Sequence, residues 1–589
     1  MVRTLKLKSG VAIPATMLAF LCVVMTYPLI TALDSAIPDL STLDAFEYCY
    51  KLWWFKHAIV DLHISPFFNS RVFYPFGYDF AMSETTLPNM VLALPITMMA
   101  GHVVGYNILV LFSFFLSALG AYLLVVYLTE NRAAGMVAGA IYAFSPYRYH
   151  MVVEGVLPTF STQWVPFLFL SLEIYLRRWR PFYAVLAGFF LALTALSSWY
   201  YGYMVGLFVP VYVVVRMWGA GRQVWRRILQ GGILLAAVTF VASLPGLVPL
   251  LSVWGSGTNW SLSHVDWWSA SLSDFVWPNI RHPLWGRVLY PAYEQLTREN
   301  DLYLGIVALT LAVVALRTRR DRTTWAYTWL SGLAGVLALG LTLHVLRDRL
   351  YIGVPSEVER VFTVGMGMLA KRLALNPAPT YYALRQQNAI YVPMPTFFLY
   401  LFLPFFNTMR FFARFGVLVT LGMSVLAGLG TTEVLRRVSR PLAVAGVLLA
   451  LVLFEFAVEP TQMGLASAAP RAIDKWLAAQ PGDFAVIEFP IDSALTGRGL
   501  FGTITHGKAI AYGYGTFYPA GFQAARAELS QFPSEASVDI LRRWGVRYAL
   551  VDTVRYGDEW PRILAELTSM TGLRMVEIAG QFHVYEVLP

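Results

Sequence analysis

Cysteine and histidine are both scarce in this chain of 589 residues, which contains two cysteines and nine histidines. Cys22 and Cys49 allow at most one disulfide, and nothing resembles a disulfide framework or a CxxC metal site. The sequence also has no HExxH motif and no pair of histidines at helical spacing. It therefore gives no sign of a disulfide-stabilised module or of a histidine-based zinc site.

Charged residues are scarce as well, and their scarcity indicates the class of protein. Charged residues make up 13% of the chain and hydrophobic residues 57%, and the mean hydropathy is +0.57. A soluble domain is nearer a quarter charged. The net charge of +9 comes mostly from short arginine clusters between apolar runs, which is a membrane-topology signal rather than a sign of nucleic acid binding. The sequence predicts a polytopic α-helical membrane protein.

The apolar runs predict about 11 to 13 spans, because many windows hold the roughly 17–25 apolar residues that cross a bilayer. The clear runs lie at 11–33, 106–128, 160–176, 182–199, 201–216, 229–251, 302–316, 325–345, 413–435 and 441–459. Shorter or interrupted runs lie at 88–101, 133–146 and 396–408. The first run lacks a small-residue cleavage site, so we interpret it as a retained helix.

Placing the arginine clusters in the cytoplasm predicts the topology in a plasma or inner membrane. The amino terminus is then inside, and the loops at 34–87, 252–301 and 346–395 are outside, as is everything after 460. The interrupted region 88–158 must supply an even number of crossings. Broken helices occur at membrane depth only when they are buried in protein or line a wet cavity, so we place part of 133–160 at a cavity wall.

The composition changes after residue 460, which divides the chain into a membrane domain, 1–460, and an extracytoplasmic α/β domain, 461–589. Short apolar runs bounded by turn residues predict strands at 484–490, 546–552 and 582–587, with helices at 521–544 and 562–570. Glu488 and His506 read as strand ends and turns, so we expect no catalytic residue in this domain.

The first outer loop, residues 34–87, combines acidic with aromatic residues. Asp44 lies near the start of a predicted short helix, where a carboxylate is favoured, and shares a face with Glu47 and Lys51. Trp53 and Trp54 follow, and such rings suit the headgroup level and can stack on sugars. Asp44 is therefore a candidate general base for an acceptor hydroxyl, the alternative being a helix cap.

A tight turn with proline and glycine follows, flanked by Tyr74 and Asp79, and Glu84 comes just before the next apolar run. Glu84 would then sit at the mouth of the cavity. It could bind sugar hydroxyls or, with Asp44, a divalent ion such as Mg²⁺ or Mn²⁺. The alternative is a solvated carboxylate at the membrane interface.

Ionisable and polar residues also gather near 145–164, where they point to a polar pathway or substrate site beside membrane helices. These residues are Arg148, His150, Glu154 and Gln163. Arg148 could pair with a phosphate through its two-pronged guanidinium. Snorkelling to the interface is the alternative.

Two later segments complete the candidate site. The outer loop 252–301 contains His282 and Glu299 and could cover the cavity, although a lone histidine is more often structural. Arg410 and Arg414 are four residues apart at the outer start of an apolar run, which predicts one helix face. A lipid phosphate between them would relieve their repulsion, and anchoring in lipid headgroups is the alternative.

Together these residues resemble bacterial multi-spanning glycosyltransferases of the GT-C superfamily, particularly YfhO-like members. The layout is similar to that of aminoarabinose lipid A transferases and protein O-mannosyltransferases. The motifs that carry the resemblance are Asp44 upstream of Trp53-Trp54, Tyr74-Pro-Phe-Gly, Ser-Pro-Tyr-Arg148, His282-Pro, Glu299 with Tyr-Leu-Gly305, Arg410 with Arg414, and Ala-Val-Ile-Glu488-Phe-Pro.

The resemblance implies a hexosyl- or pentosyltransferase of the cell envelope that uses a polyprenyl-phosphate sugar at the outer face of the membrane. The family's acidic base carries over to Asp44, and Arg148, Arg410 or Arg414 would neutralise the carrier phosphate. An acceptor hydroxyl on a glycan, lipid or protein would displace the phosphate with inversion. The first outer loop lacks an Asp-x-Asp or Glu-Asp pair, which leaves metal dependence open.

Two other functions stay open at this point. A transporter or flippase for a lipid-linked sugar would use the same cavity and arginines without needing a base. Transporters often show two related halves, which this sequence does not. A cell-envelope assembly scaffold would use the outer α/β domain to bind a partner.

Overall fold

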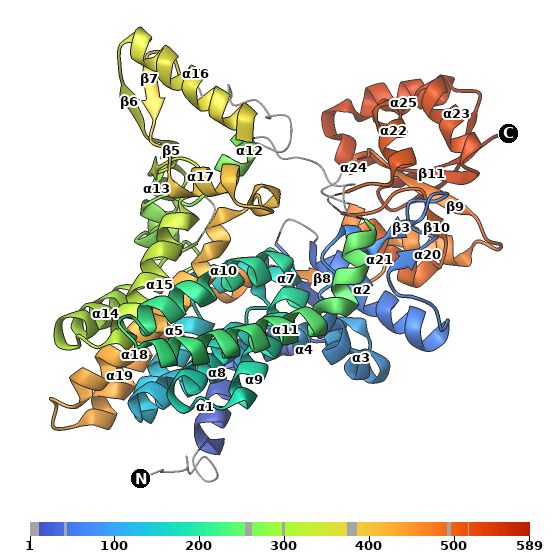
Figure 1. The fold of residues 1–589 in the computed structure, drawn as a ribbon. Coiled ribbons are helices and arrows are strands. Elements are labelled where there is room, and N and C mark those ends of the chain that lie inside the picture. The colour runs from blue at the N-terminus through green and yellow to red at the C-terminus, as the bar shows by residue number, and fades with distance from the viewer. Residues whose placement is uncertain are drawn as a thin grey trace.

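The computed structural model describes residues 11–40, 44–253, 262–296, 301–373, 384, 386–491, 496–515 and 517–589. Apolar helices pack side by side through the amino-terminal part of the chain, and a sheet flanked by helices forms the carboxy-terminal part (Figure 1). The predicted fold class, a polytopic helical protein with a carboxy-terminal α/β domain, is confirmed.

The helices fall on the predicted apolar runs. Among the described residues, three helices are long and apolar enough to cross a membrane, namely α4 (His102–Thr129), α11 (Arg222–Ser252) and Phe412–Leu435, which contains α18 (Gly416–Leu435). Shorter apolar helices are α1 (Ala12–Met25), α3 (Leu87–Ala100), α9 (Pro181–Ser197), α14 (Ile306–Thr318) and α19 (Pro441–Glu455). The total of about 11 to 13 spans stays a prediction.

Burial separates helices that face protein from helices that face outward. Nearly every residue of α18 is buried, and it packs against α14, α5 (Arg132–Ala143) and α15 (Arg322–Ala338). In contrast, α11 leaves Leu229, Ile233 and Phe240 exposed, as a helix that faces lipid would. The remaining bundle helices are α8 (Trp164–Arg178), α10 (Trp199–Arg216) and α17 (Pro395–Phe402).

The interruption predicted at the end of the short run 133–146 is present. Helix α5 ends at Ala143, and the chain continues as two short helices, α6 (Pro146–Val153) and α7 (Leu157–Phe160). Residues 134–149 are all buried, so protein surrounds this interrupted backbone, as it must at membrane depth.

The two later outer loops form a small lobe with short helices and hairpins. Its elements are α12 (Leu262–Trp267), α13 (Trp285–Leu296), β4 (His344–Val345), β5 (Asp348–Arg349), β6 (Tyr351–Gly353), α16 (Ser356–Leu373) and β7 (Ala389–Tyr391). Asp266 ties them together, because its buried carboxylate contacts His344 at 3.1 Å and the Arg349 guanidinium.

The carboxy-terminal domain contains a five-stranded sheet in the order β10-β9-β11-β13-β12. The strands are β9 (Ala485–Phe489), β10 (Ala509–Ile510), β11 (Val546–Asp552), β12 (Leu573–Ala579) and β13 (Phe582–Val587). The sheet is parallel across β10, β9 and β11, and antiparallel where β13 meets β11 and β12. The flanking helices are α20 (Ala472–Ala479), α21 (Thr496–His506), α22 (Ala520–Leu529), α23 (Glu535–Arg543) and α25 (Trp560–Ser569).

The three predicted strands of this domain are confirmed, and β10 and β12 were not predicted. The helix expected at 521–544 is two helices, because a turn that contains Pro533 separates α22 from α23. Glu488 has a structural role: its buried carboxylate pairs with Arg471 at 2.6 Å.

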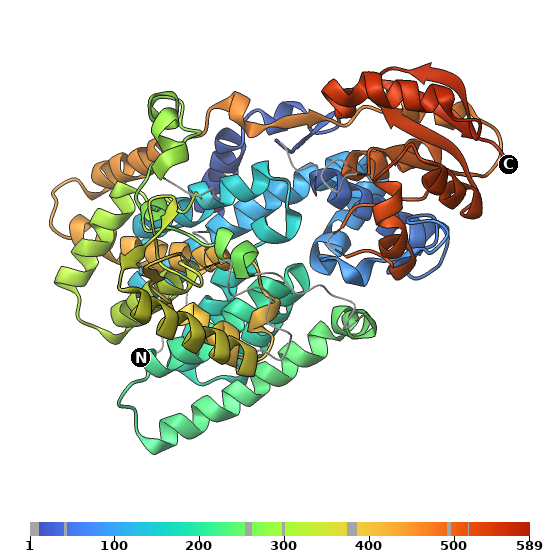
Figure 2. The ribbon, with the colours of Figure 1, turned by 90° about the horizontal axis from the view of Figure 1, so that it is seen from above.

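The first outer loop extends the carboxy-terminal sheet. The backbone N–H groups of Phe73 and Tyr74 donate to the carbonyls of Tyr512 (3.0 Å) and Ile510 (2.9 Å), and Ile510 N–H donates to the Arg71 carbonyl (2.8 Å). Figures 1 and 2 show this early segment beside the last part of the chain. A second contact pairs β1 (Ala36–Pro38) with β8 (Leu465–Ser467).

Aromatic packing seals the same joint. Phe73 is fully buried, with its ring 4.9 Å from that of Phe522 and 5.1 Å from that of Tyr78. The Arg71 guanidinium forms two hydrogen bonds with the Asp483 carboxylate, at 2.7 and 3.1 Å. The outer loop and the carboxy-terminal domain therefore share one hydrophobic core.

Replacing Phe73 with alanine tests this joint. We expect Phe73→Ala to destabilise the packed outer loop and domain by about 3–5 kcal/mol, because a buried phenyl ring is lost and a cavity remains. The measurement is thermal melting and limited proteolysis in detergent. Phe68→Ala, at a ring 49% exposed in the same loop, is the control. Equal melting temperatures for the two variants would contradict the shared core.

Candidate active site

Asp44 is the first residue of α2 (Asp44–Lys56), so the predicted short helix is confirmed. Glu47 and Lys51 form a buried ion pair at 2.6 Å one turn further along. The Asp44 carboxylate instead accepts a short hydrogen bond from the Tyr514 hydroxyl of the carboxy-terminal domain. The candidate base therefore lies at the contact between the two parts of the molecule.

The surroundings of Asp44 favour its protonated form. Burial among protein atoms raises the pKa of Asp44 to about 7, while the hydrogen bond from Tyr514 opposes the rise. The negative charges of Glu47, Asp39 and Glu154 raise the pKa of Asp44 further. A carboxyl that titrates near neutrality is suited to accept a proton.

Glu84 lies before α3 and reaches α10 and the arginines. Its carboxylate accepts a hydrogen bond from Ser198 Oγ at 2.9 Å, and its backbone carbonyl accepts one from Lys51 Nζ at 3.3 Å. Burial raises the pKa of Glu84, and the positive charge of Arg414 opposes that rise. Glu84 therefore links the first outer loop to the segment that precedes α18.

Arg410 and Arg414 do not share a helix face, so this prediction is wrong. Helix α18 begins only at Gly416, with Arg410 in extended chain and Arg414 in the 3₁₀ turn Phe412–Phe415. The two guanidinium groups nevertheless gather, with their Cζ atoms 4.4 and 4.3 Å from the centre of the Phe411 ring. The shared aromatic ring brings the two cations together instead of helical spacing.

Two further rings complete this cluster. The Arg414 guanidinium lies 4.7 Å from the Tyr200 ring, and the Tyr200 hydroxyl accepts a hydrogen bond from the Arg410 backbone N–H at 3.4 Å. Trp268, from the outer loop predicted to cover the cavity, packs its ring 4.7 Å from that of Phe411. Burial lowers the pKa of Arg410, and the negative charge of Asp44 opposes that change.

Arg148 and Gln163 lie in the interior of the helix bundle. Arg148 is 2% exposed, and its guanidinium donates to the hydroxyls of Ser113, Ser117 and Thr162. Gln163 accepts a hydrogen bond from the same Ser113 hydroxyl at 3.0 Å. The guanidinium of Arg148 is therefore held by hydroxyl groups inside the helix bundle.

His150 and Glu154 lie on the other side of Asp44, at the end of α6. His150 Nδ1 is 3.7 Å from the Asp301 carboxylate, which also pairs with Arg281 at 2.5 Å. Glu154 follows α6, and the next residue packs directly against the backbone of α2. Glu154 therefore acts on Asp44 through its charge.

The other predicted residues have structural contacts or lie elsewhere. Tyr74 packs in the joint, and the Asp79 carboxylate caps a short turn by accepting from the Ala81 N–H at 2.8 Å. His282 stacks on Trp285 with 3.5 Å between ring centres and contacts the Phe454 carbonyl at 2.8 Å. Glu299 lies outside the described residues.

The described part of the chain offers no set of three or more His, Cys, Asp or Glu side chains that could hold a metal ion. Asp44 and Glu84 instead accept hydrogen bonds from Tyr514 and Ser198. The two carboxylates do not fit a divalent-ion site, and the acid-base chemistry of Asp44 needs no metal ion. Both cysteines are buried and free, so the one conceivable disulfide does not form.

Tyr514, Tyr200 and Ser198 belong to the site but were not predicted from sequence. Ser198 lies near the end of the predicted apolar run 182–199, and Tyr200 falls between that run and the next one at 201–216, in the aromatic stretch that begins α10. Tyr514 lies in a glycine-rich segment between β10 and α22. Its proximity to Asp44 depends on tertiary packing, for which the sequence carries no local signal.

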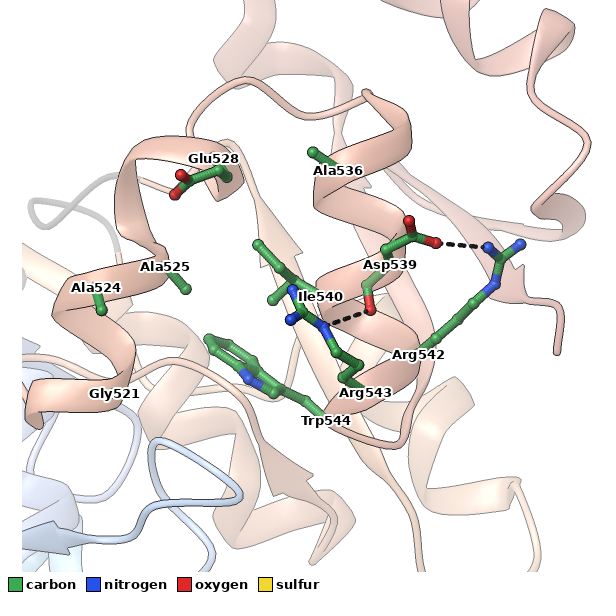
Figure 3. A pocket seen from close by; sticks show the side chains of 10 residues that line it. All are labelled: Gly521, Ala524, Ala525, Glu528, Ala536, Asp539, Ile540, Arg542, Arg543 and Trp544. Atoms are coloured by element: carbon green, nitrogen blue, oxygen red, sulfur yellow. Dashed lines mark hydrogen bonds and ion pairs between the residues drawn. The ribbon is translucent and has the colours of Figure 1, made fainter.

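A concave surface lies on the carboxy-terminal domain, and Asp44 does not line it. It is a groove of about 850 Å³ between α22 and α23. Small side chains of α22 form one wall, and Figure 3 shows Arg543 and Trp544 extending from the end of α23 toward them. None of the predicted site residues lines this groove.

Sequence comparison assigns the chain only in part. A family model described as a 6-pyruvoyl-tetrahydropterin synthase related domain, a membrane protein, matches residues 85–350. That region excludes Asp44, both arginines before α18 and the carboxy-terminal domain. No curated protein matches the chain.

Solved structures similar to this chain are membrane glycosyltransferases. Arabinofuranosyltransferase AftD from Mycobacteria is 15% identical, with a TM-score of 0.53 over 98% of this chain and 40% of its own. The apo oligosaccharyltransferase of Archaeoglobus fulgidus is 12% identical, with a TM-score of 0.50 over 96% and 72%. ArnT from Cupriavidus metallidurans, bound to undecaprenyl phosphate, is 14% identical, with a TM-score of 0.47 over 98% of both chains.

The first two similarities establish the fold. The chain shares its overall fold with these two proteins. At these identities the likeness concerns the fold, so the chemistry has to be argued from the residues themselves.

The raised pKa of Asp44 makes stability depend on pH. The folded protein holds this proton up to about pH 7, whereas the ordinary pKa is 3.8, so the protonated carboxyl adds stability that is lost between about pH 4 and about pH 7. The melting temperature of the wild type should therefore fall relative to that of Asp44→Asn across this window and run parallel above it. Parallel curves throughout would show that Asp44 titrates normally.

Proposed function

We propose that the protein is a membrane glycosyltransferase that moves a sugar from a polyprenyl-phosphate-linked donor to an acceptor hydroxyl, with inversion. The observation that carries the proposal is the convergence of two kinds of group. Asp44 is a carboxyl that titrates near neutrality, and its charge acts on Arg410. The Arg410 guanidinium in turn lies with that of Arg414 around the Phe411 ring. The GT-C fold supports the same class.

In this mechanism Asp44 acts as general base. Its carboxylate takes the proton of the acceptor hydroxyl while the acceptor oxygen attacks the anomeric carbon of the sugar. The bond between that carbon and the phosphate oxygen breaks on the opposite face, and its electron pair goes to the phosphate. The products are the glycosylated acceptor, inverted at the anomeric carbon, and the polyprenyl phosphate.

The arginines would stabilise the charge that develops on the leaving phosphate. Guanidinium groups bind phosphate through two parallel hydrogen bonds, and Arg410 and Arg414 already lie around the same Phe411 ring. A bound dianion would offset the repulsion between the two cations. Glu84, whose charge interacts with that of Arg414, would bind a sugar hydroxyl.

The arginine clusters and the acidic loop support one orientation. We propose a cytoplasmic amino terminus and a carboxy-terminal domain, residues 461–589, outside a plasma or inner membrane. The donor sugar, a hexose or a pentose, would enter from the lipid side. The acceptor would be a glycan, lipid or protein of the cell envelope.

Asp44→Asn tests the base. Removing a positioned general base typically slows turnover by about 10²–10⁴-fold, and the isosteric amide should leave donor binding intact. The assay follows transfer of radiolabelled sugar from a panel of polyprenyl-phosphate sugars to envelope glycans. Asp61→Asn, at an exposed residue of the same loop that pairs with Lys56, is the control. An Asp44→Asn protein that handles its lipid-linked sugar at the wild-type rate would instead fit a transporter.

Arg410→Lys and Arg414→Lys test the phosphate site. Lysine keeps the charge but cannot form the two parallel hydrogen bonds, so we expect the apparent donor affinity to fall by about tenfold for each variant. Arg436→Lys, at the opposite end of α18, should not change it. Unchanged donor affinity in the double variant would mean that the two arginines only anchor the chain.

A further inference from the structure

We infer that Tyr514 is a positioning residue for Asp44, and that the carboxy-terminal domain therefore contributes directly to the active site. This inference rests on the proposed role of Asp44 as the base. The observations behind it are the hydrogen bond from the Tyr514 hydroxyl to the Asp44 Oδ1 atom, which joins residues 470 positions apart in the sequence, and the packing that holds both segments in place.

The segment that carries Tyr514 is pressed against the first outer loop. A Cβ atom at Gly513 would lie 2.4 Å from the Phe73 ring, and one at Gly515 would lie 2.5 Å from the Tyr78 hydroxyl. Gly515 also has a backbone φ of +154°, a conformation that residues with a side chain rarely adopt. Both positions need glycine for this close approach to Phe73 and Tyr78. The packing of the two glycines therefore fixes the backbone position of Tyr514 between them.

Two independent contacts fix the pair of residues to the same body. The strand-like pairing of 71–74 with 510–512 holds the chain just before Tyr514. Helix α2, which begins with Asp44, packs on α21 of the same domain, with the Phe46 and Phe501 rings 5.2 Å apart. The separation between the phenol and the carboxylate is therefore set by packing on both sides and does not depend on a flexible linker.

The hydrogen bond has two consequences for a base. It fixes the rotation of the Asp44 carboxylate, and it favours the ionised form against burial and the charges of Glu47, Asp39 and Glu154. Arg410, on the segment before α18, favours the ionised form as well. Burial and the adjacent carboxylate raise the pKa of Tyr514 well above its usual value, so the phenol keeps its proton and acts only as a donor.

The test is Tyr514→Phe in the full-length protein in detergent, with the sugar-transfer assay run from about pH 5 to about pH 10.5 so that it extends above the expected new limb. Without the phenol the carboxylate should bind its proton more tightly, so the acid limb of kcat/KM should move up by about one to two pH units. Activity should recover largely above the new limb. Tyr518→Phe removes a hydroxyl from the same segment, where the ring packs on Phe73, and should leave the profile unchanged.

The outcomes separate this inference from the proposed function. If Asp44→Asn loses activity but the Tyr514→Phe profile superimposes on that of the wild type, the positioning role is overturned and the base remains. If Asp44→Asn is fully active, both are overturned. Melting temperatures give the same contrast without substrate. The pH range over which the protein loses stability relative to its Asp44→Asn counterpart should extend to higher pH in Tyr514→Phe than in the wild type. Adding Tyr514→Phe to Asp44→Asn should then cause no further loss of rate.

Discussion

The joint between the first outer loop and the carboxy-terminal sheet is the constraint on which the site depends. Backbone hydrogen bonds from 71–74 to 510–512 make the loop an added strand at the exposed edge of β10. This pairing removes an open sheet edge and gives a long loop a fixed conformation. Asp44 and Tyr514 meet because both segments are held by the same core.

The electrostatics of the site follow from that joint. The folded loop places Asp39 and Glu47 near Asp44, and Glu154 approaches from the end of α6, so that each of these three charges raises the cost of ionising Asp44. Arg410 lies on the other side and offsets part of that cost. A carboxyl in water would be ionised at neutral pH and a weak base. Crowded acids and partial burial bring its pKa into the range where proton transfer is effective.

The sequence predicted the parts of the structure that depend on local pattern. Apolar runs located the helices, short apolar runs bounded by turn residues located β9, β11 and β13, and the short helix that carries Asp44 followed from its charge pattern. The helix expected at Arg410 failed because tight aromatic packing around Phe411 and Phe412 holds this segment in extended and 3₁₀ conformations before α18. Tyr514 could not be predicted, because a contact across 470 residues leaves no periodic signal.

The same joint sets the order in which the molecule can be completed. Arg71 and its partner Gly507 are 436 residues apart, so the loop leaves the ribosome long before the strand that receives it. At about 5–20 residues per second this interval is roughly 20–90 s. During that time Val72, Phe73 and Tyr78, which end fully buried, have no sheet to pack against. A chain cut short before β10 would keep its membrane helices yet leave this apolar segment exposed, and it would be recognisable to quality-control proteases by that segment alone.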